Sequence, residues 1–428
     1  MLLSHASGRL SRLGIKRGQS PYRYPMSSAP GQVEPGQRVT PLELFFDLVF
    51  VFAITQVTGF LADNSTWLGL LRGLMLLGAL WWAWAAYAWL TNTLNPEEGS
   101  VRLAVFGSIG AMLIVSLATP NAFGAEGVVF GVAYFLVRAL HLVLYAIAGK
   151  GDPELFRAVV RIAPTASVGP ALLVVAGFLH GAPQMAVWAV ALAIDYLGVL
   201  VGHMRGWRVS PEHFVERHGL VVIIALGESI VAIGVGAAGL PLDTGRIAAA
   251  VLGMAVIAAL WWSYFDWLIY VTQARLAELA GVERAALARD LYSYLHLPMV
   301  AGIVLFALGL KTTLANVDSP LSMIPALGLC GGLALYFLAH VVARLRIGGG
   351  LGRGRPIATI VLVAMLPVTV RVPALAALGL VAAVCAGLIL YEALRHRYER
   401  AWIRDRRGAF TMEEVRHVTR PRGATPRR

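Results

Sequence analysis

The sequence predicts an all-α integral membrane protein of about twelve transmembrane helices, arranged as two parallel six-helix repeats. Three observations predict this fold: the composition, a series of long apolar windows, and an uneven distribution of Lys and Arg. Of the 428 residues, 58% are hydrophobic and only 14% are charged, and the mean hydropathy is +0.69. Because soluble domains carry about 25% charged residues, this chain has too few polar side chains to cover a water-exposed surface.

Long apolar windows locate the predicted helices. The core of a bilayer requires about 20 apolar residues for each helix. The division between the last two windows, near Arg371 and Pro373, is the least distinct. The windows cover residues 41–62, 67–91, 101–119, 126–148, 158–180, 183–204, 217–239, 246–271, 290–311, 320–343, 354–371 and 373–395.

The windows define five segments. Residues 41–204 form the first predicted six-helix repeat and residues 217–397 the second, joined by a cytoplasmic linker at 205–216. Residues 1–40 are expected to be a disordered basic cytoplasmic arm, and residues 398–428 a short charged helix followed by a basic cytoplasmic tail. Neither end has the interleaved aromatic side chains of a nucleic-acid platform, so we expect both to contact anionic lipid headgroups.

Lys and Arg residues orient the predicted spans. Cytoplasmic loops of membrane proteins are enriched in these residues. With the N-terminus inside, cytoplasmic segments contain 31 of the 36 basic residues, and Arg138 alone lies within a span. The outer loops contain Arg72, Arg246, Lys311 and Arg371. The net charge of +12 therefore predicts a membrane protein with both termini in the cytoplasm, and not a nucleic-acid-binding protein.

Two pairs of similar segments indicate an internal duplication. Ala79-Leu80-Trp81-Trp82 in the second window recurs as Ala259-Leu260-Trp261-Trp262 in the eighth. Tyr134-Phe135-Leu136 in the fourth recurs as Tyr336-Phe337-Leu338 in the tenth. Both matches are six windows apart, and an even number of spans per half gives parallel repeats. The alternative is that the Trp pairs only mark membrane interfaces.

Two carboxylates open the first window. Glu43 and Asp47 are four positions apart, so both lie on one face of a helix. Glu43 also fits a role in capping the helix, after Pro41 at its first position. Asp47 is one turn further in and fits that role poorly. Ionisable groups inside a membrane are candidates for a functional site, so both are expected to bind a solute or ion.

Arg138 and His141 share one face of the fourth window. An arginine near the middle of a bilayer stays charged and requires a carboxylate partner. Glu228 is the preferred partner, because its neighbours Gly227 and Ser229 permit close helix packing. The other candidates are Asp195, then Asp47 and Asp266. Glu228 could instead bind a proton or cation, and the sequence leaves these alternatives open.

The sequence contains no pattern that predicts catalysis or a cofactor. No P-loop, GxSxG, HExxH or dinucleotide-binding glycine pattern occurs in a usable context, so no enzyme activity is expected. Both cysteines, Cys330 and Cys385, lie in apolar windows. The histidines near residues 203–218 have no metal-ligand spacing, so no metal site is expected.

Two stretches resemble a known family. PLELFFDLVFVFAITQV (residues 41–57) and ERHGLVVIIALGESIVAIG (residues 216–234) resemble the bacterial low temperature requirement protein A (LtrA) family. The resemblance extends over nearly the whole chain and implies a multi-pass membrane protein whose activity is poorly defined. The motif positions it implies are Glu43, Phe46, Asp47, Glu216, Arg217, His218, Gly219, Gly227 and Glu228.

A second resemblance concerns only the first window. FFDLVFVFAIT is similar to the Phe-Ser-Asp signature of a lysosomal and bacterial potassium channel family, with Phe46 where the Ser would stand. The seventh window also lacks the aromatic-acid pattern. These departures argue against a two-fold pore built from four equivalent first helices.

Three functions are compatible with these observations. The leading hypothesis is a transporter or permease with a charged site between the halves, for a small solute or cation. The alternatives are a cation channel lined by the first and seventh windows, and a membrane scaffold or envelope-homeostasis factor. The sequence leaves the oligomeric state open, including a homodimer.

The basic-residue distribution leads to a prediction about topology. Reporter fusions at both termini and near Lys150, Arg208, Arg284 and Arg353 are expected to report a cytoplasmic location, because these segments contain most of the Lys and Arg. The check is paired alkaline phosphatase and green fluorescent protein fusions. A periplasmic signal from residues 205–216 would contradict the twelve-span arrangement.

Overall fold

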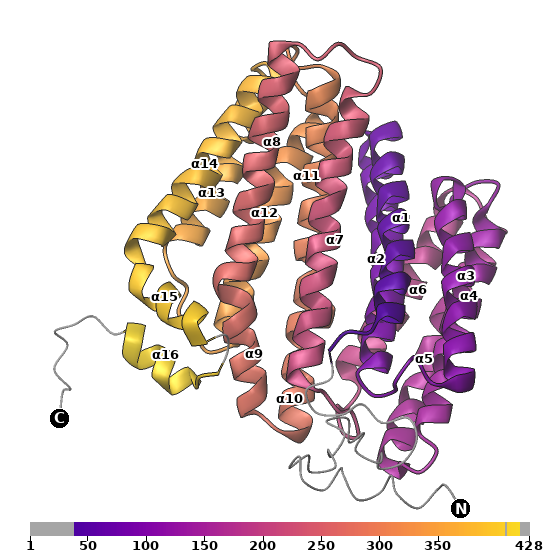
Figure 1. The fold of residues 1–428 in the computed structure, drawn as a ribbon. Helices are drawn as coiled ribbons and strands as arrows, with labels where there is room; N and C mark the ends of the chain where they lie inside the picture. The colour runs from indigo at the N-terminus through magenta and orange to yellow at the C-terminus, as the bar shows by residue number, and fades with distance from the viewer. Residues whose placement is uncertain (1–37, 407–408, 420–428) are drawn as a thin grey trace, which may run out of the picture.

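The protein is a bundle of helices (Figure 1). A computed structural model describes residues 38–406 and 409–419, so most of the predicted N-terminal arm and the end of the basic tail lie outside it. The helices of the first half are α1 (Pro41–Asp63), α2 (Trp67–Thr91), α3 (Gly99–Ala118), η1 (Thr119–Asn121), α4 (Gly127–Ala148), α5 (Pro153–Ala176) and α6 (Gly181–Val201).

The second half is also helical throughout its described residues. Two π-helices, η2 and η3, interrupt its longest helices. Its elements are α7 (Pro211–Ala237), α8 (Thr244–Ser263), η2 (Tyr264–Leu268), α9 (Ile269–Glu278), α10 (Gly281–Ala288), η3 (Arg289–Leu295), α11 (His296–Ala315), α12 (Met323–Arg346), α13 (Gly354–Thr369), α14 (Ala374–Arg395), α15 (Arg397–Arg406) and α16 (Met412–Thr419).

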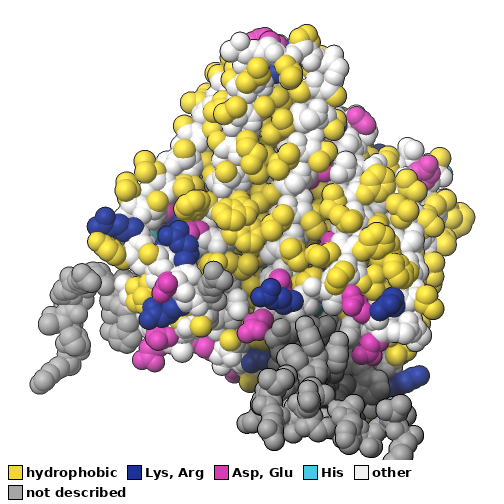
Figure 2. Space-filling model, viewed as in Figure 1, with side chains coloured by type: hydrophobic (Ala, Val, Ile, Leu, Met, Phe, Trp, Pro, Cys, Tyr) yellow, Lys and Arg dark blue, Asp and Glu magenta, His cyan; other side chains and the backbone are white. Residues whose placement is uncertain are grey.

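Eleven helices of the described chain are long and apolar enough to cross a membrane. About twelve spans were expected, and the window that falls short is residues 354–371, where the structure has the 16-residue helix α13. Large apolar side chains are exposed over the surface, for example Leu103 (72%) and Phe178 (68%). Figure 2 shows apolar side chains over most of one face, with many of the charged ones along its lower rim. This distribution fits a lipid-facing surface.

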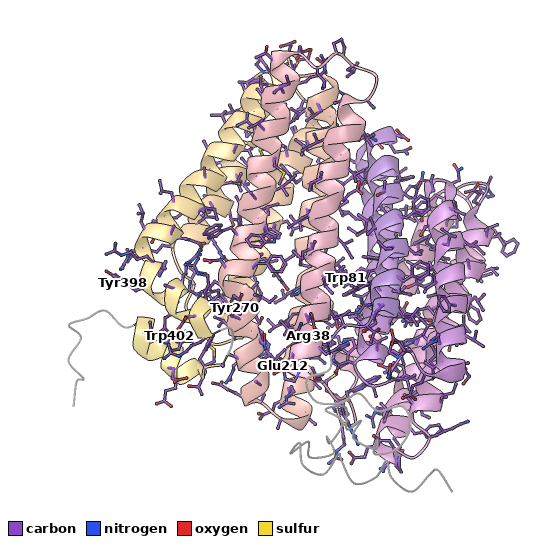
Figure 3. The ribbon with its side chains drawn as sticks, in the orientation of Figure 1. Arg38, Trp81, Glu212, Tyr270, Tyr398 and Trp402 are labelled. Carbon is purple, nitrogen blue, oxygen red and sulfur yellow. The ribbon has the colours of Figure 1, made fainter. Side chains whose placement is uncertain are left out.

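The first six helices lie beside the later ones, and many helices run along one common direction (Figure 1). We call one end of the bundle the basic end: α1 and α7 begin there, and the Arg-rich loop between α12 and α13 lies there. Arg38 and Glu212, close to the starts of α1 and α7, both lie at this end in Figure 3. Helix α11 is central, since it contacts α1, α2, α7, α8, α12 and α14.

Helix α1 begins as the sequence predicts. Thr40 is the N-cap residue, and its hydroxyl accepts a hydrogen bond from the Glu43 backbone N–H at 3.3 Å. The Glu43 carboxylate accepts one from the Thr40 N–H at 2.8 Å. This reciprocal capping box, with Pro41 in the first turn, confirms the expected capping role of Glu43. Helix α7 also begins with a proline, Pro211, so the last six residues of the expected linker are helical.

Helices α11 and α12 pack closely because glycines face each other. A Cβ atom on Gly302 would lie 2.4 Å from the Gly332 carbonyl oxygen, and one on Gly332 would lie 2.6 Å from that of Gly302. Gly309 and Gly328 make a second close approach one to two turns away. Small residues allow such backbone contact between membrane helices, so these glycines set the position of the central helix.

Helix α13 joins the two ends of the bundle although it is short. At its start, a Cβ atom on Gly354 would lie 2.9 Å from Leu388 of α14, near the basic end. After its end, the backbone N–H of Ala374 donates to the Ser319 carbonyl at 3.0 Å, in the loop between α11 and α12. An isolated bridge between Pro320 and Pro373 forms there too. Helix α13 therefore runs between the same two ends as its longer neighbours.

The glycine contact predicts a destabilising substitution. Gly302→Val places methyl groups against the α12 backbone, which cannot move aside as a side chain can, and should cost at least about 1–3 kcal/mol. The measurement is the folded fraction and melting temperature of the purified protein in detergent. The control is Gly234→Val, because a Cβ atom at Gly234 has no neighbour within 4 Å. Equal melting temperatures for the two variants would contradict the close packing.

Candidate functional site

The ionisable residues expected inside the membrane lie in four separate groups. Glu43 and Asp47 contact α7, Arg138 and His141 lie near Asp195, Glu228 lies against α1, and Asp266 contacts α15. The single site between the halves, to which several of them were expected to contribute, is not formed in this structure.

Arg217 connects α1 to α7. Its Nε lies 3.4 Å from the Glu43 carboxylate, and its Nη1 donates to the Glu43 carbonyl at 3.1 Å and to the Asp47 carboxylate. Asp47 also accepts a hydrogen bond of 2.9 Å from the indole N–H of Trp84 on α2. All three ionisable side chains are about 1% exposed. Arginine presents five donors in a planar fork, so one residue can hold both carboxylates.

His213 completes this group, which we call the α1–α7 lock: Glu43, Asp47, His213 and Arg217. The Asn92 amide lies 3.1 Å from His213 Nδ1, and the Glu43 carboxylate lies 3.2 Å from Nε2. If the amide donates to Nδ1, the proton of the neutral ring is on Nε2, which donates to Glu43. The lock then contains two carboxylates and one cation. Because α1 and α7 both begin here, their positive N-terminal ends offset the remaining negative charge.

Arg138 is paired with Asp195, and the expectation that it pairs with Glu228 is wrong. Arg138 Nη2 lies 3.6 Å from the Asp195 carboxylate. This distance is compatible with an ion pair but too long for a hydrogen bond. Glu228 lies on α7, which packs against α1, α8 and α11, whereas α4 and α6 both pack against α2 and α5. The arrangement of the helices therefore decides the partner, because it brings Asp195 of α6 close to α4.

A cavity adjoins Arg138 within the first half. Its walls come from α2, α4, α5, α6 and the loop after α6, and η3 contributes Ser293. The empty space, including its open mouth, is about 580 Å³. Indole rings of Trp82, Trp89 and Trp207 line it, together with Arg138 and His141. Because Gly202 to Met204 and Trp207 belong to the loop before α7, the cavity lies toward the basic end.

Several polar atoms around this cavity have no partner among the described residues. They are Nε and Nη1 of Arg138, Nδ1 of His141 and the hydroxyl of Tyr145. His141 Nε2 lies 3.2 Å from the Ala86 carbonyl, which only accepts, so Nε2 carries the proton and Nδ1 is an acceptor. Buried polar groups normally have partners. The cavity therefore offers two unused donors of a cation, an acceptor and a hydroxyl to a ligand.

Hydroxyl groups bind Glu228 directly, while Lys311 acts on it only electrostatically. The Thr55 hydroxyl donates to its carboxylate at 2.5 Å, and Thr58 lies within hydrogen-bonding reach. Glu228 is 2% exposed, and no ion pair involving it occurs in the described part of the chain. A buried carboxylate outside any ion pair is suited to binding a proton or cation. The alternative of a structural pair with Arg138 is not formed, and the binding of a proton or cation by Glu228 stays a prediction.

Asp266 belongs to a group of charges at the basic end. Its carboxylate is contacted by Arg400 at 2.7 Å and by Arg404 at 2.9 Å, both from α15. Glu392 of α14 bonds to Arg400 and, at 2.9 Å, to Arg355. Arg400 is only 5% exposed. The charged helix expected after residue 398 is present, but this arginine is buried against the bundle and does not face lipid headgroups.

The remaining motif positions surround the α1–α7 lock or lie along α7. Phe46 stacks on Tyr87 with ring centroids 4.8 Å apart. The carboxylate of Glu216 accepts from the Val39 N–H at 3.3 Å. His218 is fully buried beside Trp84. A Cβ atom on Gly219 would meet Ile269 at 3.1 Å, whereas one on Gly227 would have no neighbour within 4 Å.

Sequence reasoning missed several residues of these groups. His213 lies in the stretch predicted to be the cytoplasmic linker, and Arg400 in the predicted charged helix before the basic tail. Tyr145 and Trp89 carried no signal beyond belonging to apolar helices, although Tyr145 lies one turn after His141 on the same face. Within residues 38–406 and 409–419, no group of three or more His, Cys, Asp or Glu side chains could hold a metal ion.

Comparisons with known proteins agree with this architecture. Residues 38–390 match the family model described as bacterial low temperature requirement A protein (LtrA). The chain is 32% identical over 291 residues to the uncharacterized protein RA0937 of Rhizobium meliloti (strain 1021), covering 64% of this chain and 69% of that protein. No solved structure matches the chain.

The lock predicts a stability defect with a specific rescue. Arg217→Leu leaves Glu43 and Asp47 buried without their cation and should cost about 3–5 kcal/mol. Adding Asp47→Asn removes one of these charges and should recover part of the loss. The measurement is melting temperature and folded yield in detergent. Glu216→Gln, the exposed neighbour, is the control, and a wild-type melting temperature for Arg217→Leu would contradict the role of the lock.

Proposed function

Because the chain belongs to the bacterial low temperature requirement A (LtrA) family, we propose that this multi-pass membrane protein is a permease that carries a small organic anion. The observation that supports the proposal is the cavity beside Arg138, where a buried guanidinium has two N–H-bearing nitrogens without partners. A charged side chain within a membrane span is costly and is a functional candidate by default.

The donors of Arg138 favour a carboxylate. A guanidinium N–H forms a charge-assisted hydrogen bond to a carboxylate oxygen, and such bonds are strong. Asp195 meets only Nη2, so Nε and Nη1, whose N–H groups point to different sides of the guanidinium, each remain for one ligand oxygen. Asp195 keeps the guanidinium oriented in the empty cavity without occupying those positions. A ligand oxygen would replace water that the buried nitrogens otherwise require.

The other walls restrict the rest of the ligand. Trp82, Trp89 and Trp207 offer aromatic surfaces to an apolar or planar body. His141 Nδ1 is an acceptor, and the Tyr145 hydroxyl can donate or accept. A ligand that combines a carboxylate, a small apolar body and one hydroxyl or amino group would match the guanidinium, the indole rings and the polar atoms of His141 and Tyr145.

Carrier behaviour is the form of transport that this arrangement supports. The cavity lies toward the basic end, so a solute bound there needs a rearrangement of the helices to leave at the other end. Glu228 lies on α7, outside the cavity, and is held by Thr55. We assign to Glu228 the coupling role, in which a proton or cation binds its carboxylate during the cycle.

The alternatives have less support. A cation channel between α1 and α7 would require an open path, and the α1–α7 lock bridges these helices at the basic end. A scaffold in which buried charges only stabilise the fold accounts for the lock, but not for the unused donors of Arg138. No catalytic activity is proposed.

We also propose that the two halves are parallel repeats. Contacts in the first half recur in the second. Helix α1 packs on α2 and α3, as α7 packs on α8 and α11. Helices α3 to α6 contact one another in series, as α11 to α14 do, and α2 contacts α6 as α8 contacts α14. The Tyr134 hydroxyl donates to the Ala79 carbonyl, and the Tyr336 hydroxyl to that of Leu260. The Trp pairs differ, because Trp81 is buried and Trp261 is 46% exposed.

Contacts across the α1–α7 interface support the same proposal. Glu43 meets His213, Asp47 meets Arg217, and Thr58 meets Glu228, and in each pair the second residue lies 170 positions after the first. Corresponding residues face one another where a two-fold axis passes between parallel helices. The basic-residue distribution adds the orientation: both termini cytoplasmic in a bacterial cell membrane.

Ligand binding at Arg138 can be tested with matched pairs of small molecules. Each carboxylate of a panel is compared with its neutral amide, such as benzoate with benzamide, using the fluorescence of the cavity tryptophans and thermal shift. Carboxylates should bind and amides should not. Arg138→Met combined with Asp195→Asn removes both charges together, and should weaken binding by roughly 10–100-fold, the value of one charge-assisted interaction.

The controls separate binding from folding. Arg102→Gln removes an exposed arginine at the basic end and should bind like the wild type. Proteoliposomes loaded with the tightest-binding carboxylate then test exchange, which Glu228→Gln should slow without preventing binding. Equal binding by an acid and its amide, or no loss in the double variant, would reject the anion site.

A further inference from the structure

A second hollow lies at the basic end of the second half, far along the chain from the Arg138 cavity. It is formed by η2, α12, the loop after α12, and the ends of α13, α14 and α15. Its empty space, including its open mouth, is about 1070 Å³. Five arginines line it against two glutamates: Arg344, Arg353, Arg355, Arg395 and Arg400, with Glu392 and Glu399. We call it the arginine pocket.

The glutamates of the arginine pocket are already occupied. Glu392 is bonded by Arg355 and Arg400. Glu399 accepts from the Trp267 indole at 3.3 Å and lies 3.2 Å from His396. No further carboxylate lines the pocket. Glu399 acts electrostatically on Arg344, but five arginines against two glutamates leave the pocket with an excess of positive charge.

Three of these arginines have no carboxylate within ion-pair distance in residues 38–406 and 409–419: Arg344, Arg353 and Arg395. Arg344 stacks over Trp267 at 5.4 Å, and its Nε is buried without a hydrogen-bond partner. The glycine-rich loop covers it, since a Cβ atom on Gly352 would lie 3.1 Å from Arg344 Nη1. Arg353 and Arg395 are exposed, and guanidinium groups with free donors around one hollow are suited to an anion with several oxygens.

An apolar groove continues from the arginine pocket along the surface of the bundle. The two hollows share Arg353, Gly354 and Tyr391. Beyond these residues the groove is lined only by apolar side chains and glycine, from Ile357 to Val361 on α13 and from Val384 to Leu388 on α14. From Arg353 to Val361 it rises roughly 12 Å along the helix. It is exposed where apolar helices face lipid: Ile357 is 58% exposed.

We propose that the arginine pocket and this groove form one binding site for an anionic phospholipid. The phosphate of the headgroup lies among Arg344, Arg353 and Arg395, and an acyl chain lies in the groove between α13 and α14. Basic pockets between helices at the cytoplasmic side of a membrane bind phosphate headgroups. A free phosphate compound would use the pocket but would leave the groove empty, so the groove favours the lipid.

The site also has a structural consequence for α15. The same pocket contains Arg400, which joins α15 to Asp266 and Glu392. A bound phosphate next to Arg395 and His396 neutralises the positive charge that gathers where α14 meets α15. Figure 2 shows basic side chains over this part of the surface. Occupancy should therefore hold α15 against the bundle.

The test uses the full chain, purified and stripped of lipid in detergent. Phosphatidylglycerol, phosphatidylcholine and glycerol 3-phosphate are each titrated, and bound molecules are counted by native mass spectrometry. Phosphatidylglycerol should bind at one site and raise the melting temperature, whereas phosphatidylcholine and glycerol 3-phosphate should bind at least about tenfold more weakly, because each lacks either the net charge or the acyl chain.

Two variants separate headgroup from chain. Arg353→Gln with Arg395→Gln should weaken phosphatidylglycerol binding about tenfold or more. Neither arginine makes an ion pair in the described chain, so folding should persist. Gly387→Leu fills the groove, where a Cβ atom has no neighbour within 4 Å, and should also weaken lipid binding. Matched controls are Arg102→Gln with Arg157→Gln, and Gly110→Leu, which change exposed positions of the first half.

Each outcome decides the proposal. Loss of binding in both test variants and in neither control supports a specific lipid site. Glycerol 3-phosphate that binds as tightly as the lipid, with no effect of Gly387→Leu, would overturn the lipid in favour of a soluble phosphate. Equal binding of phosphatidylglycerol and phosphatidylcholine, unaffected by the arginine changes, would show only a lipid shell without a site.

Discussion

The arrangement of the two halves depends on one ion-paired contact, in which Arg217 of α7 holds Glu43 and Asp47 of α1. In a bilayer, apolar side chains gain little by leaving lipid for another helix, so close packing and polar contacts decide which helices associate. Arg217 can satisfy both acids only when α1 and α7 begin at the same level. The lock thereby fixes the register of the two halves and brings Trp84 of α2 into the same group.

Buried charges are divided between two tasks in this fold. In the lock and around Asp266, cations and anions are in direct contact, and such groups hold helices together. Around Arg138, the acid that pairs with it among the described residues, Asp195, lies at a longer distance, and donors remain unused. An unpaired buried donor costs free energy, so a site of this kind is maintained at the expense of stability. The difference in pairing separates the candidate binding cavity from the structural ion pairs.

The sequence predicted the helices better than their contacts. Hydropathy locates spans because each helix makes its backbone hydrogen bonds within itself in the membrane. The expected windows match helices from α1 to α14. The start of α1 was also predictable, because Thr40, Pro41 and Glu43 form a local pattern. The partner of Arg138 was not, since a sequence does not show which helices are neighbours: α4 and α6, which carries Asp195, both pack on α5, whereas Glu228 lies on α7 against α1. Arg400 was missed because α15 folds back onto helices that are distant in sequence.

Helix α13 gives the molecule a region of reduced hydrophobic thickness. Its 16 residues span about 24 Å, whereas a typical hydrocarbon core measures about 30 Å. The acyl chains of lipids beside α13 must shorten locally, or the polar groups at the ends of α13 lie among the acyl chains. A tilt of α13 would increase the difference between its length and the thickness of the hydrocarbon core. The surrounding bilayer should therefore be thinnest along this side of the second half. The energy of deforming the bilayer then acts on the protein at α13.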